Sequence, residues 1–290
     1  MSMHHPGLLG YGRVPGSLGI RPVLGLLAAS AREKPTERIF EPEPVSGWDA
    51  ELRMTDFAGE PIAFIPPVVD EVRQGRTGNC PVVATLAAMA HAAPDRAARI
   101  STRGAKVAAQ VIDTRETIPT RRKQLEDTVL YKVRFAKGDP VEVTGLLWNR
   151  GGRLEYALST QGALWPSILE KAYVVAHGGH SYDRIFATVT PYEAMTNILG
   201  PVDELVLASN PKTLESTLRQ ADKRPTVADT LTTLPAVPGI PAGIIAFHTY
   251  AVLDLRGNKV EVYNVLDGAH IPVPLKVFEH VFETVVQHRG

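Results

Sequence analysis

One cysteine in the sequence stands where a thiol could act as a nucleophile. Cys80 precedes the run of small apolar residues 81–93, which predicts a buried helix of about three turns. Because proline is tolerated in an α-helix only within the first turn, Pro81 places Cys80 at the N-terminal end of this helix. Unpaired amides and the helix dipole favour an anion there, which predicts a lowered thiol pKa. The alternative is that Cys80 is one more small residue that only packs.

An amide side chain lies at a suitable place for such a nucleophile. Gln74 comes six residues before Cys80, across the glycines Gly75 and Gly78. From this position its side chain could donate to an oxyanion that forms next to the sulfur. A helix that served only packing would need no such donor, so the pattern favours chemistry at Cys80.

A predicted hairpin brings a histidine and an asparagine to one face of a sheet. Segments 243–255 and 259–267 have the pattern of two strands joined by a turn near Gly257. His248, in the middle of the first predicted strand, then lies opposite Asn264 or diagonal to it, depending on where the turn is centred. An amide beside an imidazole fixes its tautomer and leaves the other nitrogen for a thiol. A lone histidine in a strand is otherwise more often a hydrogen-bonded core residue.

The order Gln, Cys, His and Asn is the papain-like arrangement. Segment 74–90, QGRTGNCPVVATLAAMA, resembles the calpain signature in which Gln-Gly precedes Gly-Asp-Cys-Trp and an alanine-rich helix. Segment 163–185 is similar to the calpain elements Leu-Trp-Pro, Leu-Leu-Glu-Lys-Ala-Tyr and Gly-Ser-Tyr, in that order. Segment 247–255, FHTYAVLDL, resembles the calpain strand Gly-His-Ala-Tyr-Ser-Val, and 263–268, YNVLDG, stands where calpains carry Arg-Asn-Pro-Trp-Gly. The resemblance covers residues 70 to about 290.

The resemblance implies a fold and a set of roles. The fold is α+β and papain-like, with two lobes: a helical one in which Cys80 begins a helix, and a β-rich one that carries His248 and Asn264. Cys80 would be the nucleophile, His248 the general base and then acid, and Asn264 the residue that orients the imidazole. Gln74 and the Cys80 amide would form the oxyanion hole. The activity would be that of a thiol endopeptidase on protein or peptide substrates. The alternatives are a papain-fold glutamine deamidase or transglutaminase, and a calpain-like interaction module without activity.

The sequence departs from the calpain pattern around the site. Pro81 follows the nucleophile in place of tryptophan, and Asn79 precedes it in place of aspartate. Val265 and Leu266 replace the Pro-Trp pair that shields the Asn–His hydrogen bond of the family. These changes put the efficiency of catalysis in question more than the identity of the nucleophile.

No cofactor and no metal site are expected. Segment 74–80 contains no carboxylate, so a hard cation such as calcium would lack charged ligands there. Asp70 and Glu71 lie just upstream and are the nearest candidate ligands. No loop with the acidic spacing of an EF-hand follows the protease-like part. We therefore expect activity that is independent of calcium.

The pattern of turn formers and charges divides the chain into three parts. Residues 1–58 are rich in glycine, proline and charged side chains and predict an N-terminal arm or linker. The two lobes are then expected at 59–200 and 201–290. Short antiparallel strands are expected between 128 and 160, and helices at 163–179, 211–223 and, with one apolar face, 274–287.

Composition excludes several classes of protein. The 290 residues, 44% of them hydrophobic, can bury a substantial core, and 31 basic residues balance 31 acidic ones, so nucleic acid is not an expected partner. A single cysteine rules out an intramolecular disulfide. No run approaches the roughly 18 to 20 apolar residues of a membrane span, and prolines and arginines interrupt the N-terminal apolar stretch. We expect a cytoplasmic protein, or one exported without a Sec-type signal peptide. The compact sequence resembles that of a bacterial stand-alone calpain-like protein. Such a protein would be an effector or toxin, with an inhibitor or immunity protein as partner.

Overall fold

The computed structural model describes residues 41–46, 52–56, 67–96, 101–103, 130–207 and 211–290. The chain divides after Pro35 into two units. The first, Met1–Pro35, lies outside the described residues. The second, Thr36–Gly290, contains every helix and strand named below. The predicted α+β class is confirmed, whereas the two-lobe papain-like layout stays a prediction.

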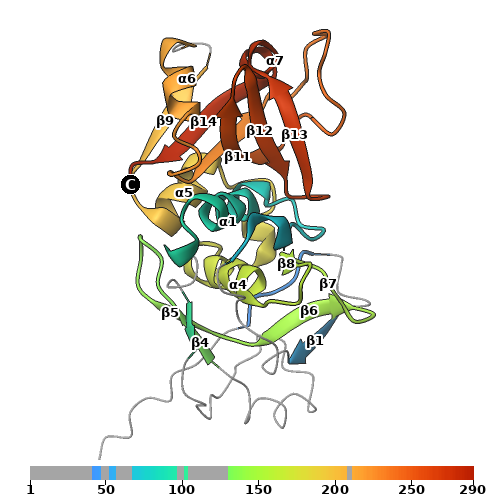
Figure 1. The fold of residues 1–290 in the computed structure, drawn as a ribbon. Helices are drawn as coiled ribbons and strands as arrows, with labels where there is room; N and C mark the ends of the chain where they lie inside the picture. The colour runs from blue at the N-terminus through green and yellow to red at the C-terminus, as the bar shows by residue number, and fades with distance from the viewer. Residues whose placement is uncertain (1–40, 47–51, 57–66, 97–100, 104–129, 208–210) are drawn as a thin grey trace, which may run out of the picture. The chain divides into compact units, whose positions relative to one another are not determined.

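Helix α1 (Cys80–Ala92) is the central helix of this unit (Figure 1). Each residue from Pro81 to Ala90 is buried, as expected of a helix that is apolar all round. The helix packs against α4 (Trp165–His177), against α5 (Pro191–Leu199), and against three strands of the large sheet. The helix predicted to follow Cys80 is therefore confirmed.

Helix α4 (Trp165–His177) has the ends that its sequence predicts. Pro166 lies in the first turn, where its missing N–H costs no hydrogen bond. Gly178 caps the C-terminus by donating its N–H to the Val174 carbonyl over 2.8 Å. A Cβ at this position would lie 2.8 Å from the same carbonyl oxygen, so the helix end needs glycine.

A six-stranded antiparallel sheet forms the C-terminal part of the unit (Figure 1). Its strands, in spatial order, are β13 (Ala269–Pro274), β12 (Lys259–Asn264), β11 (Thr249–Arg256), β10 (Thr226–Thr230), β14 (Phe282–His288) and β9 (Val202–Val206). One face contributes to the core around α1, α4 and α5. The other face is covered by α6 (Pro211–Leu218) and α7 (Leu275–Val281).

The hairpin β11–β12 has the geometry that places His248 and Asn264 on one side. Arg256 pairs with Lys259, which leaves a two-residue turn. An irregularity in β11 shifts the register, so that Ala251 pairs with Tyr263 nearer the open end. Continuing this register makes His248 and Asn264 diagonal neighbours, one of the two arrangements predicted from the sequence.

His248 itself lies one residue before β11, so its predicted position in the middle of a strand is wrong. The preceding residue, Phe247, has φ of 52°, which interrupts the extended backbone. Thr230, the last residue of β10, then fixes His248 from both sides. Its hydroxyl oxygen accepts from the His248 N–H at 3.0 Å, and its own N–H donates to the His248 carbonyl at 3.0 Å.

The prediction of a closing helix over 274–287 is wrong in its second half. Helix α7 ends at Val281, and Phe282–His288 continues as β14 between β10 and β9. The segment contains the β-branched run 284–286, which fits a pleated strand better than a helix. Insertion between two strands also satisfies its backbone hydrogen-bonding groups on both sides.

The strands predicted between 128 and 160 are present from Leu130 onward, but they pair in three small sheets. These contain β1 (Arg53–Asp56), β6 (Leu146–Arg150) and β7 (Arg153–Leu154); β2 (Val72–Arg73) and β8 (Leu158–Ser159); and β3 (Ser101–Arg103), β4 (Leu130–Val133) and β5 (Val141–Thr144). Short 3-10 turns occur at Val69–Glu71 and Tyr182–Arg184. Residues 128 and 129 lie outside the described residues.

The N-terminal arm predicted over 1–58 includes residues that belong to the larger unit. Glu41 forms a buried ion pair with Lys171 of α4, and Val45 is buried in the main core. Glu43 forms a parallel bridge with Ser181, and β1 pairs with β6. Residues 41–46 and 52–56 are therefore part of the larger unit. The remainder of the predicted arm lies outside the described residues, and the lobe boundary at residue 200 stays a prediction.

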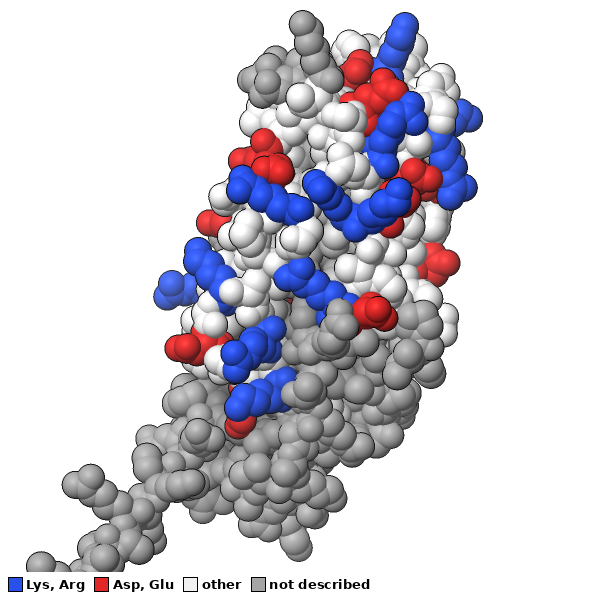
Figure 2. All heavy atoms as spheres, turned by 60° about the vertical axis from the view of Figure 1, so that its left-hand side comes forward, with Lys and Arg blue, Asp and Glu red and all other residues white. Residues whose placement is uncertain are grey.

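Charges of both signs are mixed on the surface. Figure 2 shows basic and acidic side chains interspersed over the described part of one face. Within the described ranges, every helix is too short or too polar to cross a membrane.

Candidate active site

Cys80 is the first residue of α1, as the sequence predicts. Asn79 caps the helix through its backbone: its carbonyl accepts from the Val82 N–H at 2.9 Å. Pro81 lies in the first turn. The partly exposed thiol therefore projects from the end of a helix whose body is buried.

The predicted lowering of the thiol pKa is wrong. Burial raises the pKa of Cys80, and this effect outweighs the hydrogen-bonding groups on the backbone and side chain of Thr249, which lower it. The carboxylate of Asp229 raises the pKa of Cys80 further. The helix terminus alone suggested an anion, but the loss of water around the sulfur has the larger effect.

His248 and Asn264 form a buried hydrogen-bonded pair. The distance from His248 Nε2 to Asn264 Oδ1 is 3.0 Å, and both side chains are buried. The backbone N–H of Leu266 donates to the same Oδ1 over 3.1 Å. Because a backbone N–H can only donate, the atom it contacts must be the amide oxygen, so His248 Nε2 carries the proton. The lone pair of the imidazole is then on Nδ1.

The imidazole is neutral near pH 7. Burial lowers the pKa of His248 to about 4, although the hydrogen bond that it donates to Asn264 and the carboxylate of Asp267 act in the opposite direction. The ring of Tyr250 packs edge-on against it, with the centroids 4.8 Å apart. The histidine is thus a neutral base held in one tautomer.

The structure brings Cys80 to the residue next to His248, not to the imidazole itself. The groups of β11 that act on the sulfur belong to Thr249. Among the described residues, no hydrogen bond joins Cys80 to His248. The predicted site is therefore assembled as a His–Asn pair with the thiol beside it.

Gln74 is buried in the loop that precedes α1. Its backbone N–H donates to the Val265 carbonyl over 2.7 Å, which joins this loop to the residue after Asn264. Its side-chain Nε2 donates to the Thr77 carbonyl, and the same amide has a second N–H. The loop is tight at Gly75, where a Cβ would lie 2.1 Å from the carbonyl oxygen of Glu155.

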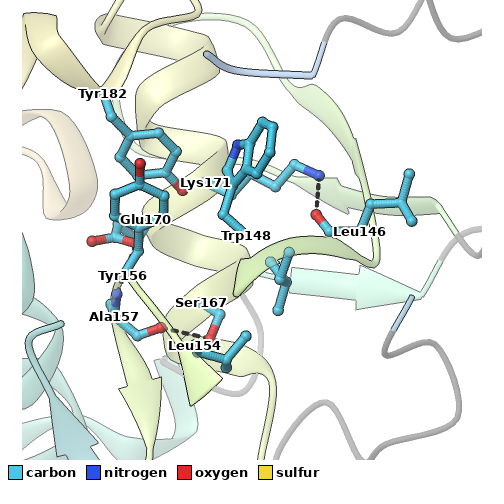
Figure 3. Close-up of a pocket in the computed structure, with 10 residues that line it drawn as sticks. Leu146, Trp148, Leu154, Tyr156, Ala157, Ser167, Glu170, Lys171 and Tyr182 are labelled. Carbon is cyan, nitrogen blue, oxygen red and sulfur yellow. Dashed lines mark hydrogen bonds between the residues drawn. The ribbon is translucent and has the colours of Figure 1, made fainter. Parts of the chain in front are cut away.

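Sequence reasoning missed a buried carboxyl group next to Asn79, the residue that precedes Cys80. Asn79 Nδ2 donates to Glu170 Oε1 at 2.5 Å, and the Ala157 N–H donates to Oε2 at 2.9 Å. Burial raises the pKa of Glu170 to about 7. Figure 3 shows this carboxyl in a small pocket beside Tyr156. The replacement of the family's aspartate by Asn79 was the signal in the sequence, because that side chain faces Glu170.

The acidic residues upstream of the loop have protein partners. The Asp70 carboxylate lies 2.6 Å from His270 Nε2. The carboxylate of Glu71 is fully buried and accepts from Ser159 Oγ at 2.9 Å and from Trp165 Nε1 at 2.8 Å. In the part of the chain that the structure describes, no group of three or more His, Cys, Asp or Glu side chains is arranged to hold a metal ion. Independence from calcium stays a prediction.

The arrangement is typical of one class of protein. A cysteine that begins a helix, together with an imidazole oriented by an asparagine on an antiparallel sheet, is characteristic of papain-like cysteine peptidases. The sequence model of the calpain family cysteine proteases matches residues 48–266, which include the loop before Cys80, His248 and Asn264. The chain belongs to the calpain family of cysteine proteases, and the resemblance seen in the sequence is confirmed. A comparison with curated proteins finds no match.

Proposed function

We propose that the protein is a thiol endopeptidase with Cys80 as nucleophile, His248 as general base and acid, and Asn264 as the orienting residue. The observation that carries the proposal is the pair of hydrogen bonds to Asn264 Oδ1, from His248 Nε2 and from the Leu266 N–H. They leave His248 Nδ1 unprotonated, as a base for the thiol must be.

Both reacting groups start neutral. Burial raises the pKa of Cys80 and lowers the pKa of His248 to about 4, so the thiol and the imidazole are both uncharged at pH 7. When substrate binds, the Cys80 side chain turns from Thr249 toward His248 Nδ1. The sulfur attacks the peptide carbonyl carbon while its proton passes to Nδ1, which makes this step general-base catalysis.

The remaining steps use the same groups. The carbonyl oxygen becomes an oxyanion that accepts from the Cys80 N–H and from the second N–H of Gln74 Nε2. The imidazolium of His248 then protonates the leaving amine, and a thioester remains on Cys80. A water molecule gives a proton to Nδ1 and attacks the thioester carbon. The C–S bond then breaks, the acid is released, and the imidazolium returns the proton to the Cys80 sulfur.

The substrate decides between this activity and the related alternatives. A deamidase or transglutaminase would form the same thioester from a glutamine side chain, and an interaction module would form none. The roles of effector or toxin, and an inhibitor or immunity partner, are further proposals that rest on the family resemblance alone.

Mass spectrometry of protein substrates incubated with the enzyme tests the proposal. New peptide termini are expected with the wild type and not with Cys80→Ala or His248→Ala. His280→Ala is the matched control, because His280 is an exposed histidine on α7 and its loss should leave cleavage unchanged. Changes at glutamine side chains would indicate a deamidase or transglutaminase, and no change at all would indicate the module. Cleavage that persists in Cys80→Ala would refute the cysteine mechanism.

A further inference from the structure

A threonine links the nucleophile to a carboxylate that the proposed mechanism does not use. Asp229 on β10 pairs in register with Thr249 on β11. The Thr249 hydroxyl donates to Asp229 Oδ1 over 2.6 Å. Thr249 is fully buried, and its backbone and side chain both lie close enough to act on the Cys80 sulfur.

The threonine hydroxyl has only one proton to donate. A hydrogen bond donated by the Thr249 hydroxyl lowers the pKa of Cys80, but the Asp229 carboxylate competes for the same proton. While Asp229 is ionised and accepts this proton, the hydroxyl can offer the sulfur only its lone pairs. A lone pair can accept from a thiol S–H, but it repels a thiolate. When Asp229 is protonated it can donate to the hydroxyl oxygen instead, and the hydroxyl proton becomes free to stabilise a thiolate.

The Asp229 charge also raises the pKa of the Cys80 thiol. After burial, which is the main cause, the Asp229 carboxylate contributes to the raised pKa of Cys80. Burial also raises the pKa of Asp229, and Glu283 on β14 adds to this rise. Tyr250 also interacts with Cys80, and Asp267 acts on both Tyr250 and His248.

We propose that Asp229, acting through the Thr249 hydroxyl, holds Cys80 in its protonated form and so sets the pH at which the nucleophile becomes reactive. Asp229 is thus a positioning residue, which touches neither the substrate nor the sulfur. This inference rests on the proposed role of Cys80 as nucleophile, but its test needs no substrate.

The pH dependence of alkylation by iodoacetamide measures the proton affinity of the thiol directly. Cys80 is the only cysteine of the chain, so the label reports on this residue alone. Asp229→Asn should move the midpoint of the alkylation rate to lower pH by about one unit and raise the rate at pH 7 about tenfold. Asp203→Asn is the matched control, because Asp203 lies on β9 of the same sheet and pairs with Arg289 at the surface. Its profile should match the wild type.

The link through the hydroxyl is tested by a double-mutant cycle. In a Thr249→Val background the shift caused by Asp229→Asn should shrink, because the hydroxyl no longer connects the two groups. A shift of equal size in both backgrounds would overturn the relay, and an unchanged midpoint in Asp229→Asn would overturn the whole inference. If Asp229→Asn fails to fold, Asp229→Ser provides the same loss of charge in a smaller side chain. Peptide cleavage by Cys80→Ala bears on the proposed function instead, so the two failures can be told apart.

Discussion

Replacing Glu170 with glutamine is expected to remove a pH dependence from the stability of the protein. The carboxyl of Glu170 is fully buried on α4, and burial raises its pKa from 4.5 to about 7. Its two hydrogen bonds, from Asn79 and from the Ala157 N–H, are too few to offset the loss of water. The folded protein therefore retains this proton at a pH where the unfolded chain releases it.

The size of the effect follows from the shift. Each unit of pKa corresponds to about 1.4 kcal/mol, so a rise from 4.5 to about 7 corresponds to about 3 kcal/mol. Below pH 4.5 the group is protonated in both states, and there is no cost. As the pH rises from about 4.5 to 7, the unfolded state ionises first and the free energy of unfolding falls by this amount. Above the folded pKa the loss is complete.

Glutamine can replace the protonated carboxyl and keep hydrogen bonds to both Asn79 and Ala157. Asn79 Oδ1 is buried and has no hydrogen-bond partner among the described residues. A rotation of the Asn79 amide would let this oxygen accept from the new amide of Glu170→Gln. The remaining amide oxygen could still accept from Ala157.

Urea unfolding at about pH 4.5 and pH 8 measures the difference. The free energy of unfolding of Glu170→Gln, relative to wild type, should rise by about 3 kcal/mol between the two pH values. Glu204→Gln is the control, because Glu204 is an exposed carboxylate on β9, and its curve should parallel the wild type. If the free energies of unfolding of wild type and Glu170→Gln change in parallel with pH, Glu170 does not have a raised pKa in the folded protein.

Three further outcomes are expected. His248→Ala should lower kcat more than Asn264→Ala, because the asparagine only orients the imidazole; kinetics that give the reverse order would exchange the two roles. Glu41→Ala should destabilise the fold by about 3 kcal/mol in thermal or urea unfolding, because it removes the ion-pair partner of Lys171, whose side chain is only 2% exposed. Glu215→Ala removes the partner of Arg219 in an exposed ion pair and should cost less than about 1 kcal/mol of stability. Equal losses of stability in the two variants would contradict a stabilising role for the buried Glu41–Lys171 pair. Titration of calcium into chelator-treated enzyme should leave peptide hydrolysis unchanged, and a saturable activation would show a metal switch.

The helices at the centre of the fold could be predicted because local chemistry determines their ends. Pro81 and Pro166 mark the first turns of α1 and α4, and Gly178 ends α4. The C-terminal segment could not be predicted in the same way. Its apolar residues at 277, 278, 281, 282 and 285 fit one face of a helix, yet Phe282–His288 pairs with two strands that are distant in sequence. Periodicity within a segment carries no information about those partners.

The candidate site shows the same division. The pairing of His248 with Asn264 depends on a short hairpin, so counting along the chain was enough to place them on one side. The neighbours of the thiol could not be found by counting, because the register of β10 against β11 is set across the long segment between them. The predicted lowering of the thiol pKa was wrong for a related reason. The helix terminus can be recognised in the sequence, but the burial that outweighs its effect cannot.

The position of β14 in the sheet affects how the chain folds while it is being synthesised on the ribosome. Strand β10, which carries Asp229, lies between β11 and β14, and β14 is synthesised after the other strands of this sheet. At about 5–20 residues per second, the segment between β10 and β14 takes roughly 3 to 10 s to synthesise. During that interval β10 has an open edge, and β9 has no neighbour within the sheet. The nascent chain therefore exposes an unfinished sheet beside the candidate site until β14 has been synthesised.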